Sequence, residues 1–274
     1  MRTRHSSDLV QAHEARHMTI ALLGYGRFGQ AFADLLHDAG HTVAVFDPNA
    51  AVPIALRRAS LAEAIDGADW IVLAVSVPAI ESVLRELKPL LSQGQTVIDV
   101  GSVKELPCRL MDELLGADIE HAGTHPLFGP LSLARGERPL RTVLCASELH
   151  PETARRTRSL LESLGCEVIE RDAASHDRAM AETHALAFFI AKALVDMGIG
   201  EDLSMAPPSF LGLANMLAAV RGDAGHLFAA IQRENPYAAE ARAALIEHLG
   251  AIHRRLSDAE GAALSIPDMN EPPS

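Results

Sequence analysis

The stretch MTIALLGYGRFG (residues 18–29) decides the fold of this 274-residue chain. An apolar run over residues 18–24 ends in glycine, and an amphipathic helical pattern follows from about residue 27. A buried strand that passes through a glycine-rich turn into a helix is the opening unit of a doubly wound α/β domain. We therefore expect the first part of the chain to be built from alternating strands and helices.

The alternation continues to about residue 170. Strand-like runs occupy residues 41–47, 70–75, 96–101, 118–123, 141–146 and 166–170, with helical patterns over 27–39, 60–66, 78–91, 103–115 and 151–164. Near-continuous apolar strands separated by helices predict an α/β fold of the Rossmann type, with a doubly wound, mostly parallel sheet covered by helices on both faces.

Beyond residue 173 the pattern is purely helical, and it includes one long predicted helix over residues 174–198. We predict four segments: a flexible tail (1–17), a dinucleotide-binding domain (18–171), an all-helical domain (172–262) and a second flexible tail (263–274). The helical half is too apolar to stand alone in water, so we expect it to form a homodimer.

Composition excludes several classes of function. The net charge of −12 leaves no basic stripe to neutralise phosphates, which argues against a nucleic-acid partner. No apolar run approaches the roughly 18 residues that a membrane span requires. The three cysteines (Cys108, Cys145 and Cys166) form no CxxC pair, so we expect no metal site. A sparse, odd set of cysteines suits the reducing cytoplasm, and the first 17 residues lack the apolar core of a targeting signal.

The glycine-rich turn is the first candidate site. Residues Gly24, Tyr25, Gly26, Arg27, Phe28 and Gly29 match GxGxxG, and this pattern between a strand and a helix places free N–H groups against a pyrophosphate. Asp47 ends the second strand, where a carboxylate accepts hydrogen bonds from ribose hydroxyls and repels a 2′-phosphate. The sequence therefore favours NAD over NADP. Ser76, Val77 and Pro78 end the third strand and either line the nicotinamide side of the site or form a plain turn.

The second candidate site lies at the ends of the fourth and fifth strands. The segments DVGSVKE (99–105) and GTHPLFGP (123–130) follow these strands and should face the cofactor cleft. Two glycines and two prolines predict a stiff, irregular loop that holds His125 still, either as a turn cap or as a general base for the hydroxyl proton of a carbinol. Ser102 could bind the same hydroxyl or orient the imidazole. Because His125 must be neutral to act, we expect activity to fall at acidic pH.

Three further positions have simpler interpretations. Lys104 is one of only three lysines, and a solvated side chain at a helix start is its simplest interpretation. His176 and Asp177 begin the long predicted helix, where a helix cap is expected. His184 lies on that helix and is either a packed core histidine or a ligand contact.

Taken together, GYGRFG, DVGSVK, THPLFGP and SHDRAMAETHALAF (175–188) resemble the prephenate/arogenate dehydrogenase family of tyrosine biosynthesis, over roughly residues 18–260. The resemblance implies a nucleotide-binding domain, a helical dimerisation domain and NAD(P)-linked oxidative decarboxylation of a cyclohexadienol. It implies that His125 accepts or polarises the hydroxyl proton while Ser102 binds the hydroxyl. Aromatisation with loss of CO₂ would make the reaction effectively irreversible.

The chain departs from the family in its helical half. Many members carry a substrate-contacting histidine where this chain has Phe188, and His184, one turn earlier, is expected to replace it. The arginine that binds the substrate side-chain carboxylate in many members corresponds to Leu211. Arg221 or a residue of a partner chain would then bind that carboxylate. These departures leave the choice between prephenate and arogenate open.

Two alternatives remain at this stage. The chain could be a two-domain dehydrogenase of the β-hydroxyacid or imine type, in which Lys192 on the long helix would be the candidate catalytic group. It could also be an NAD-binding regulatory protein without turnover, which would require the glycine-rich turn but neither Ser102 nor His125.

Overall fold

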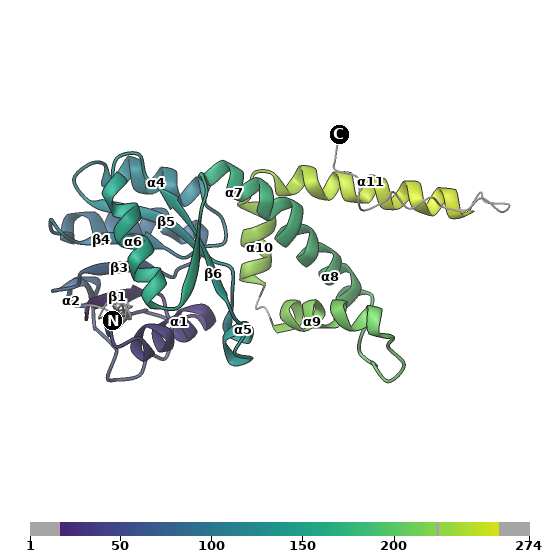
Figure 1. Cartoon of the computed structure of the whole chain (residues 1–274), viewed down its shortest axis with the longest axis horizontal. Coiled ribbons are helices and arrows are strands. Elements are labelled where there is room, and N and C mark those ends of the chain that lie inside the picture. Colours follow the sequence, from purple (N-terminus) through teal and green to yellow (C-terminus); the bar gives the residue numbers. More distant parts are fainter. Residues whose placement is uncertain (1–16, 223–224, 258–274) are drawn as a thin grey trace, which may run out of the picture.

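The computed structural model describes residues 17–222 and 225–257, and its first half is a doubly wound α/β domain (Figure 1). Its strands are β1 (Thr19–Leu23), β2 (Thr42–Phe46), β3 (Trp70–Leu73), β4 (Thr96–Asp99), β5 (Glu120–Pro126), β6 (Leu140–Ala146) and β7 (Cys166–Glu170). They form one sheet in the order β2-β1-β3-β4-β5-β6-β7. Every neighbouring pair is parallel except β5 and β6, which confirms the mostly parallel sheet. The strand order reverses beside β1, and ligands of such sheets bind at this switch point.

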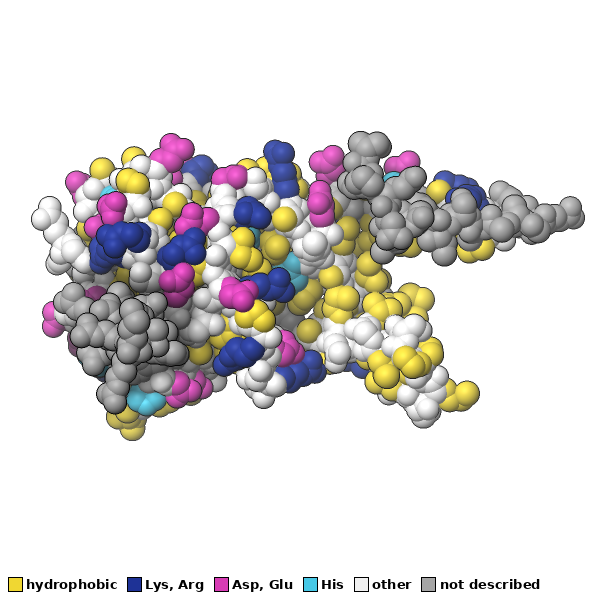
Figure 2. All heavy atoms as spheres, viewed as in Figure 1, with side chains coloured by type: hydrophobic (Ala, Val, Ile, Leu, Met, Phe, Trp, Pro, Cys, Tyr) yellow, Lys and Arg dark blue, Asp and Glu magenta, His cyan; other side chains and the backbone are white. Residues whose placement is uncertain are grey.

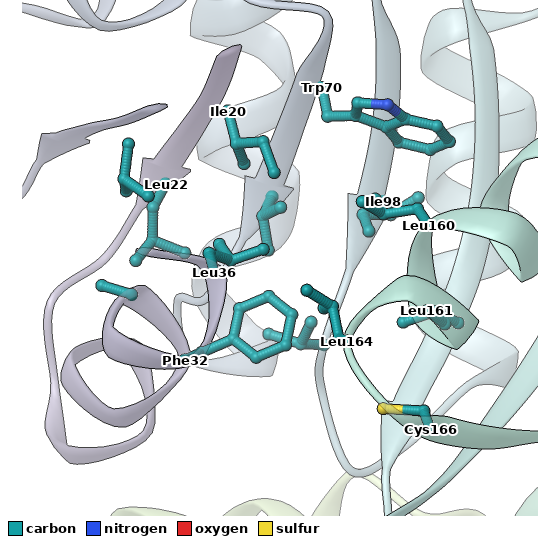
Figure 3. Packing of buried hydrophobic residues seen from close by; sticks show 14 of the residues in the cluster. Ile20, Leu22, Phe32, Leu36, Trp70, Ile98, Leu160, Leu161, Leu164 and Cys166 are labelled. Carbon is teal, nitrogen blue, oxygen red and sulfur yellow. The ribbon is translucent and has the colours of Figure 1, made fainter. Parts of the chain in front are cut away.

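Helices cover both faces of the sheet. Helices α1 (Arg27–Asp38) and α6 (Pro151–Ser163) pack on one face, and α2 (Leu61–Ile65), α3 (Ile80–Leu87) and α4 (Glu105–Leu115) pack on the other. The alternation of side chains along β1 shows why: Ile20 and Leu22 pack with α1, whereas Ala21 and Leu23 pack with α2 and α3. Figure 3 shows the first of these cores, in which Phe32 and Leu36 of α1 face the strands. Three short helices complete the domain: η1 (Val77–Ala79), η2 (Lys88–Leu90) and α5 (Pro130–Ala134).

The second half is helical. It comprises α7 (Ala173–Met180), a π-helical turn η3 (Ala181–Ala185), α8 (Leu186–Asp196), α9 (Pro208–Gly222), α10 (His226–Arg233) and α11 (Ala238–Ser257). Helices α8, α9 and α10 share a small core, while α11 projects away from the rest of the molecule (Figure 1). The predicted tails fall almost entirely outside the described residues. No helix among the described residues combines the length and apolarity needed to cross a bilayer.

The segment GTHPLFGP differs from the irregular loop that we expected. Gly123–Pro126 continue strand β5, and His125 lies opposite Val143 of β6 in an antiparallel ladder. Strand β4 ends opposite Gly123, so the last residues of β5 reach past it toward the carboxyl edge of the sheet. Pro126 is tolerated because it ends the strand, where a missing N–H costs least. His125 is therefore immobilised by sheet pairing as well as by the rigidity of proline.

Candidate active site

The glycines of the turn after β1 are required for two different reasons. A Cβ at Gly29 would lie 2.4 Å from the carbonyl oxygen of Gly24, and one at Gly24, whose φ is +104°, would lie 2.5 Å from that of Ala74. These two glycines allow strand and helix to approach closely. Gly26 has an ordinary φ of −66°, and a Cβ there would meet nothing within 4 Å. The space beside Gly26, at the N-terminus of α1, therefore fits a pyrophosphate.

Asp47 lies at the end of β2, directly beside this turn. One of its oxygens accepts a hydrogen bond from the backbone N–H of Tyr25 (2.7 Å), and the other accepts from the N–H groups of Asn49 (2.8 Å) and Ala50 (3.0 Å). These bonds fix the carboxylate, and its remaining lone pairs can accept ribose hydroxyls. The structure thus brings the acid and the glycine-rich turn together, as the motif spacing predicted.

Two of the other residues predicted to bind the cofactor, Arg27 and Phe28, have side chains that contact other parts of the protein. The ring of Phe28 packs against Phe32 (5.5 Å between centroids) and against Phe128 (6.2 Å), and the guanidinium of Arg27 donates to the carbonyl of Gly222 in α9. The Phe28 side chain therefore packs within the α/β half, and the Arg27 side chain links that half to the helical half. Ser76, Val77 and Pro78 begin η1 after β3, and a methyl of Val77 lies 3.4 Å from the Cβ position of Gly101. The ends of β3 and β4 thus adjoin each other, as expected for one cleft.

The GSVK segment after β4 contains one expected and one unexpected feature. Ser102 is buried, and within the described residues its hydroxyl makes no hydrogen bond, so it is available to a ligand. The interpretation of Lys104 as a solvated side chain is wrong. Its ammonium is completely buried and forms an ion pair with Asp99. Helical periodicity could not reveal this pair, because the partner lies on the preceding strand.

Asp99 anchors the ends of β4 and β5. Its carboxylate accepts hydrogen bonds from the N–H groups of Gly101 (2.9 Å) and Thr124 (3.3 Å) in addition to the Lys104 ammonium. Burial raises the pKa of Asp99, and the adjacent Lys104 charge opposes this rise. We take Asp99 as ionised, because a buried ammonium needs its paired anion. The sequence shows an acid at this strand end, but no local pattern indicates that it pairs with Lys104 and binds the backbone of β5.

His125 belongs to a chain of three side chains. Its Nδ1 lies 2.8 Å from Nε2 of His176, and Nδ1 of His176 lies 2.7 Å from a carboxylate oxygen of Asp177. All three side chains are buried. The expectation that His176 and Asp177 cap their own helix is wrong, because Asp172 caps α7 by accepting from the N–H of Ser175 (2.8 Å). The position of His176 and Asp177 near the start of a helix suggests a capping role, and the sequence alone does not show that Asp172 fills that role instead.

Asp177 caps a different helix from the one that carries it. Its two oxygens accept hydrogen bonds from the backbone N–H groups of Lys104 (2.8 Å) and Glu105 (2.9 Å), at the start of α4. A carboxylate is favoured there by the free N–H groups and the helix dipole. Asp177 therefore connects the helical half of the chain to the start of α4.

His184 lies beside His125, in the π-helical turn. The two imidazole rings are nearly parallel, with centroids 6.3 Å apart and an interplanar angle of 13°. The ring of Phe188 contacts the ring of His184 edge-on, with centroids 4.7 Å apart. Burial, with a smaller contribution from His176, lowers the pKa of His184 to about 4. The structure thus places His184 where a ligand contact is possible, and the wider π-helical turn accompanies this placement.

Arg221 is held away from the histidines. Its guanidinium donates to the carbonyl groups of Gly200 and Ile199, both at 3.1 Å, beyond the end of α8. His184 precedes α8 and the two carbonyl groups follow it, so they lie about 20 Å apart along the helix axis at a rise of about 1.5 Å per residue. Among the described residues, no group of three or more metal-ligating side chains is arranged to hold a metal ion.

The glycine-rich turn at the switch point and the fixed acid at the end of β2 are typical of a dinucleotide-binding α/β domain, and a buried histidine lies at the same edge of its sheet. Residues 42–170 match the family model described as prephenate dehydrogenase, nucleotide-binding domain. Over these residues the chain is thus similar to the nucleotide-binding domain of the prephenate dehydrogenase family.

Similar proteins agree with this assignment. The chain is 28% identical over 182 residues to a probable arogenate/prephenate dehydrogenase of Methanocaldococcus jannaschii, covering 64% of this chain and 40% of that protein. It is 32% identical over 188 residues to the chloroplastic arogenate dehydrogenase 1 of Arabidopsis thaliana, covering 62% of this chain and 29% of that protein. The chain thus spans less than half the length of these two relatives.

A solved structure supports the fold over a longer stretch. The prephenate dehydrogenase from A. aeolicus, in complex with hydroxyphenyl propionate and NAD+, superimposes with a TM-score of 0.69 at 21% identity. The match covers 88% of this chain and 91% of that one. Both halves of the molecule therefore share the architecture of that protein.

Proposed function

We propose that the protein catalyses the NAD⁺-dependent oxidative decarboxylation of prephenate or arogenate, which yields 4-hydroxyphenylpyruvate or tyrosine. The observation that carries this proposal is the state of His125. Burial lowers its pKa well below the ordinary value of a histidine, and the neighbouring His176, Lys104 and His184 add to this effect. The imidazole is therefore neutral near pH 7 and competent to accept a proton at the carboxyl edge of the sheet.

The chain's own residues account for the handling of the substrate hydroxyl. Ser102 donates to or accepts from this hydroxyl, and His125 accepts its proton as the carbonyl develops. His184 lies beside His125 and offers a second contact to the ring substituents. An NAD⁺ whose pyrophosphate is held at the glycine-rich turn would supply the hydride acceptor, its nicotinamide, to this edge of the sheet. Sheet pairing holds His125 in place, which matters because an error of about 1 Å can cost roughly 100-fold in rate.

We propose NAD rather than NADP as the cofactor. The carboxylate of Asp47 is held by three backbone N–H groups beside the glycine-rich turn, so it cannot turn away from an incoming 2′-phosphate. Repulsion between the two anions disfavours NADP.

The lysine-based alternative finds no support in the geometry. The ammonium of Lys192 forms an ion pair with Asp196 one turn along α8, and both side chains are exposed. It therefore lies apart from the buried imidazoles. A regulatory protein without turnover would still bind NAD⁺, and only an assay separates that alternative from an enzyme.

We further propose a homodimer formed through the helical half. Helix α11 carries exposed Ile246, Leu249, Ile252 and Leu256 along its length. Figure 2 shows apolar side chains gathered over the neighbouring lobe of α8 and α9, where Met197 and Leu211 are exposed. An apolar surface of this kind is typical of an interface.

We also propose a cytoplasmic location. The three cysteines are unbridged, which suits a reducing compartment.

The decisive experiment is a steady-state assay at 340 nm with prephenate and arogenate, each with NAD⁺ and with NADP⁺. We expect reduction of NAD⁺ with at least one of the two substrates. Calorimetric titration of the same preparation with NAD⁺ serves as the control for an intact cofactor site. Binding of NAD⁺ without reduction on either substrate would contradict the proposed activity and favour the regulatory alternative.

A further inference from the structure

We propose that His176 and Asp177 act as a positioning relay that holds His125 in the Nδ1–H tautomer, so that its Nε2 is the proton acceptor. The inference concerns the tautomer of a buried imidazole and rests on the proposed function only for its catalytic consequence. It follows from three contacts, taken in order from the carboxylate outward.

The carboxylate of Asp177 sets the direction of the first hydrogen bond. One of its oxygens accepts from the backbone N–H of Lys104 and the other from that of Glu105, at the start of α4, so both oxygens act as acceptors. An ionised carboxylate can only accept hydrogen bonds. The contact of 2.7 Å to His176 therefore requires that Nδ1 of His176 carries the hydrogen.

The second hydrogen bond follows from the first. A neutral His176 with its hydrogen on Nδ1 has a lone pair on Nε2, which lies 2.8 Å from Nδ1 of His125. Nδ1 of His125 must then donate, and its Nε2 is left with a lone pair. A doubly protonated His176 would instead donate from Nε2 to Nδ1 of His125 and leave the hydrogen of His125 on Nε2, which is the tautomer that would overturn the relay.

The same arrangement prepares His125 for the charge that it gains. Once Nε2 accepts a proton, the imidazolium donates through Nδ1 to His176, which remains hydrogen-bonded to the anionic Asp177. No proton has to move along the chain, as in the serine protease triad, where the buried aspartate orients and stabilises its histidine. Because His176 and Asp177 lie on α7 while α4 supplies the backbone N–H groups, packing of the two halves of the molecule determines the tautomer.

The test compares two substitutions of His176. In His176→Gln the amide can donate to Asp177 and accept from His125, so it can replace both hydrogen bonds. In His176→Phe neither bond remains. Nitrogen-15 NMR of labelled histidine in the full chain without substrate reports which ring nitrogen of His125 is protonated. We expect Nδ1–H in the unaltered protein and in His176→Gln, and loss of this preference in His176→Phe.

Kinetics provide the second readout. A wrong tautomer in the serine protease triad lowers kcat by about 10⁴-fold. We expect kcat to fall at least about 100-fold in His176→Phe and less than about 10-fold in His176→Gln, with little change in KM in either. Thermal unfolding of both variants checks that the fold is retained.

The outcomes separate this inference from the proposed function. An Nε2–H signal for His125 in the unaltered protein would overturn the relay, whatever the turnover and even if His176→Phe does not fold. Equal kcat values in the two folded variants would also overturn it. The expected tautomer without turnover on either substrate would leave the relay intact and reject the proposed activity.

Discussion

At the scale of single residues, His125 shows how burial sets the chemistry of a side chain. It is 5% exposed, and loss of hydration is the largest reason that its pKa lies well below 6.5. A desolvated imidazole resists protonation, so it remains a base under conditions in which an exposed histidine is already charged.

This shift changes the pH dependence that the sequence alone suggests. The base is active when neutral and is lost only as pH falls through its lowered pKa. We therefore predict that kcat/KM stays constant from pH 8 to below pH 6.5 and decreases only at more acidic pH. The measurement is a profile of kcat/KM at constant ionic strength, with thermal stability followed in parallel. An acid limb centred at or above pH 6.5 would contradict the assignment of His125.

Direct replacement tests the same residue. His125→Asn keeps a side chain that can hydrogen-bond to His176 but removes the proton acceptor. General-base catalysis typically contributes 10²- to 10⁴-fold, so we predict a loss of kcat in roughly that range with unchanged affinity for NAD⁺. Steady-state kinetics and calorimetry measure the two quantities. A variant with near-normal kcat would show that the proton leaves by another route.

His184 links pH to stability. Its pKa of about 4 lies below the value of roughly 6.5 in an unfolded chain, so between these values the unfolded state binds more protons. Its contribution to stability is present above pH 6.5 and is lost as pH falls toward 4. Lowering the pH from 7 to 5 should cost about 2 kcal/mol through this group.

Urea unfolding at pH 7 and pH 5 checks this value. In His184→Phe, which keeps an aromatic ring beside Phe188, the loss of stability between the two pH values should be smaller by about that amount. An identical loss in both proteins would show that His184 is not held neutral by the fold.

At the scale of elements, the turn between β1 and α1 contains one glycine that the fold requires, Gly29, and one that we expect only the ligand to require, Gly26. Gly29→Ala would drive a Cβ into the carbonyl of Gly24, so it should lower stability by about 1–3 kcal/mol. Gly26→Ala meets nothing within the protein and should leave the melting temperature nearly unchanged, while it weakens NAD⁺ binding by at least about 10-fold. Thermal unfolding and calorimetric titration measure the two effects. Unchanged affinity in Gly26→Ala would place the pyrophosphate elsewhere.

The connection between β4 and α4 depends on the buried ion pair of Lys104 and Asp99. Removing one partner leaves a buried charge without compensation, which typically costs 3–5 kcal/mol. We predict a loss of about this size for Lys104→Met in denaturant unfolding. Lys88→Met, at an exposed lysine, is the matched control and should change stability by less than about 0.5 kcal/mol. Equal effects would restore the interpretation of Lys104 as a solvated side chain.

At the scale of the whole molecule, the projecting helix α11 is difficult to explain in a monomer. It contains 20 residues, all of them described. Of these, Ala238 at the start of the helix is the one that is buried. Helices of globular proteins gain most of their stability from packing an apolar face. A second copy of the chain would supply that packing for α11.

We predict that the unaltered chain is a dimer by light scattering and that Leu249→Glu combined with Ile252→Glu shifts it to a monomer. Burying two new charges without partners opposes association. His253→Glu, at an exposed position of the same helix, controls for the added charge and should remain dimeric. A monomeric unaltered chain would contradict the proposed interface.

Much of the architecture and part of the site could be predicted from local pattern. The alternation of strands and helices, the glycine-rich turn and the acid at the end of β2 all follow from short-range periodicity and spacing, because each depends on neighbours close in the chain. Placement of His125 beside a strand end was predictable for the same reason. Its membership in the strand was not, since glycine and proline locally favour a turn and the pairing partner lies on β6.

The sequence by itself determined the doubly wound sheet, the nucleotide-binding turn and the identity of one candidate base. Only the tertiary structure decided the surroundings of that base: the burial of Lys104 against Asp99, the cap that Asp177 provides for α4, and the contact of His176 with His125. These pairs join residues on different elements. Their energies depend on desolvation and on distances between elements, which for Asp177 and His176 cross between the two halves of the molecule, and neither quantity is contained in local periodicity.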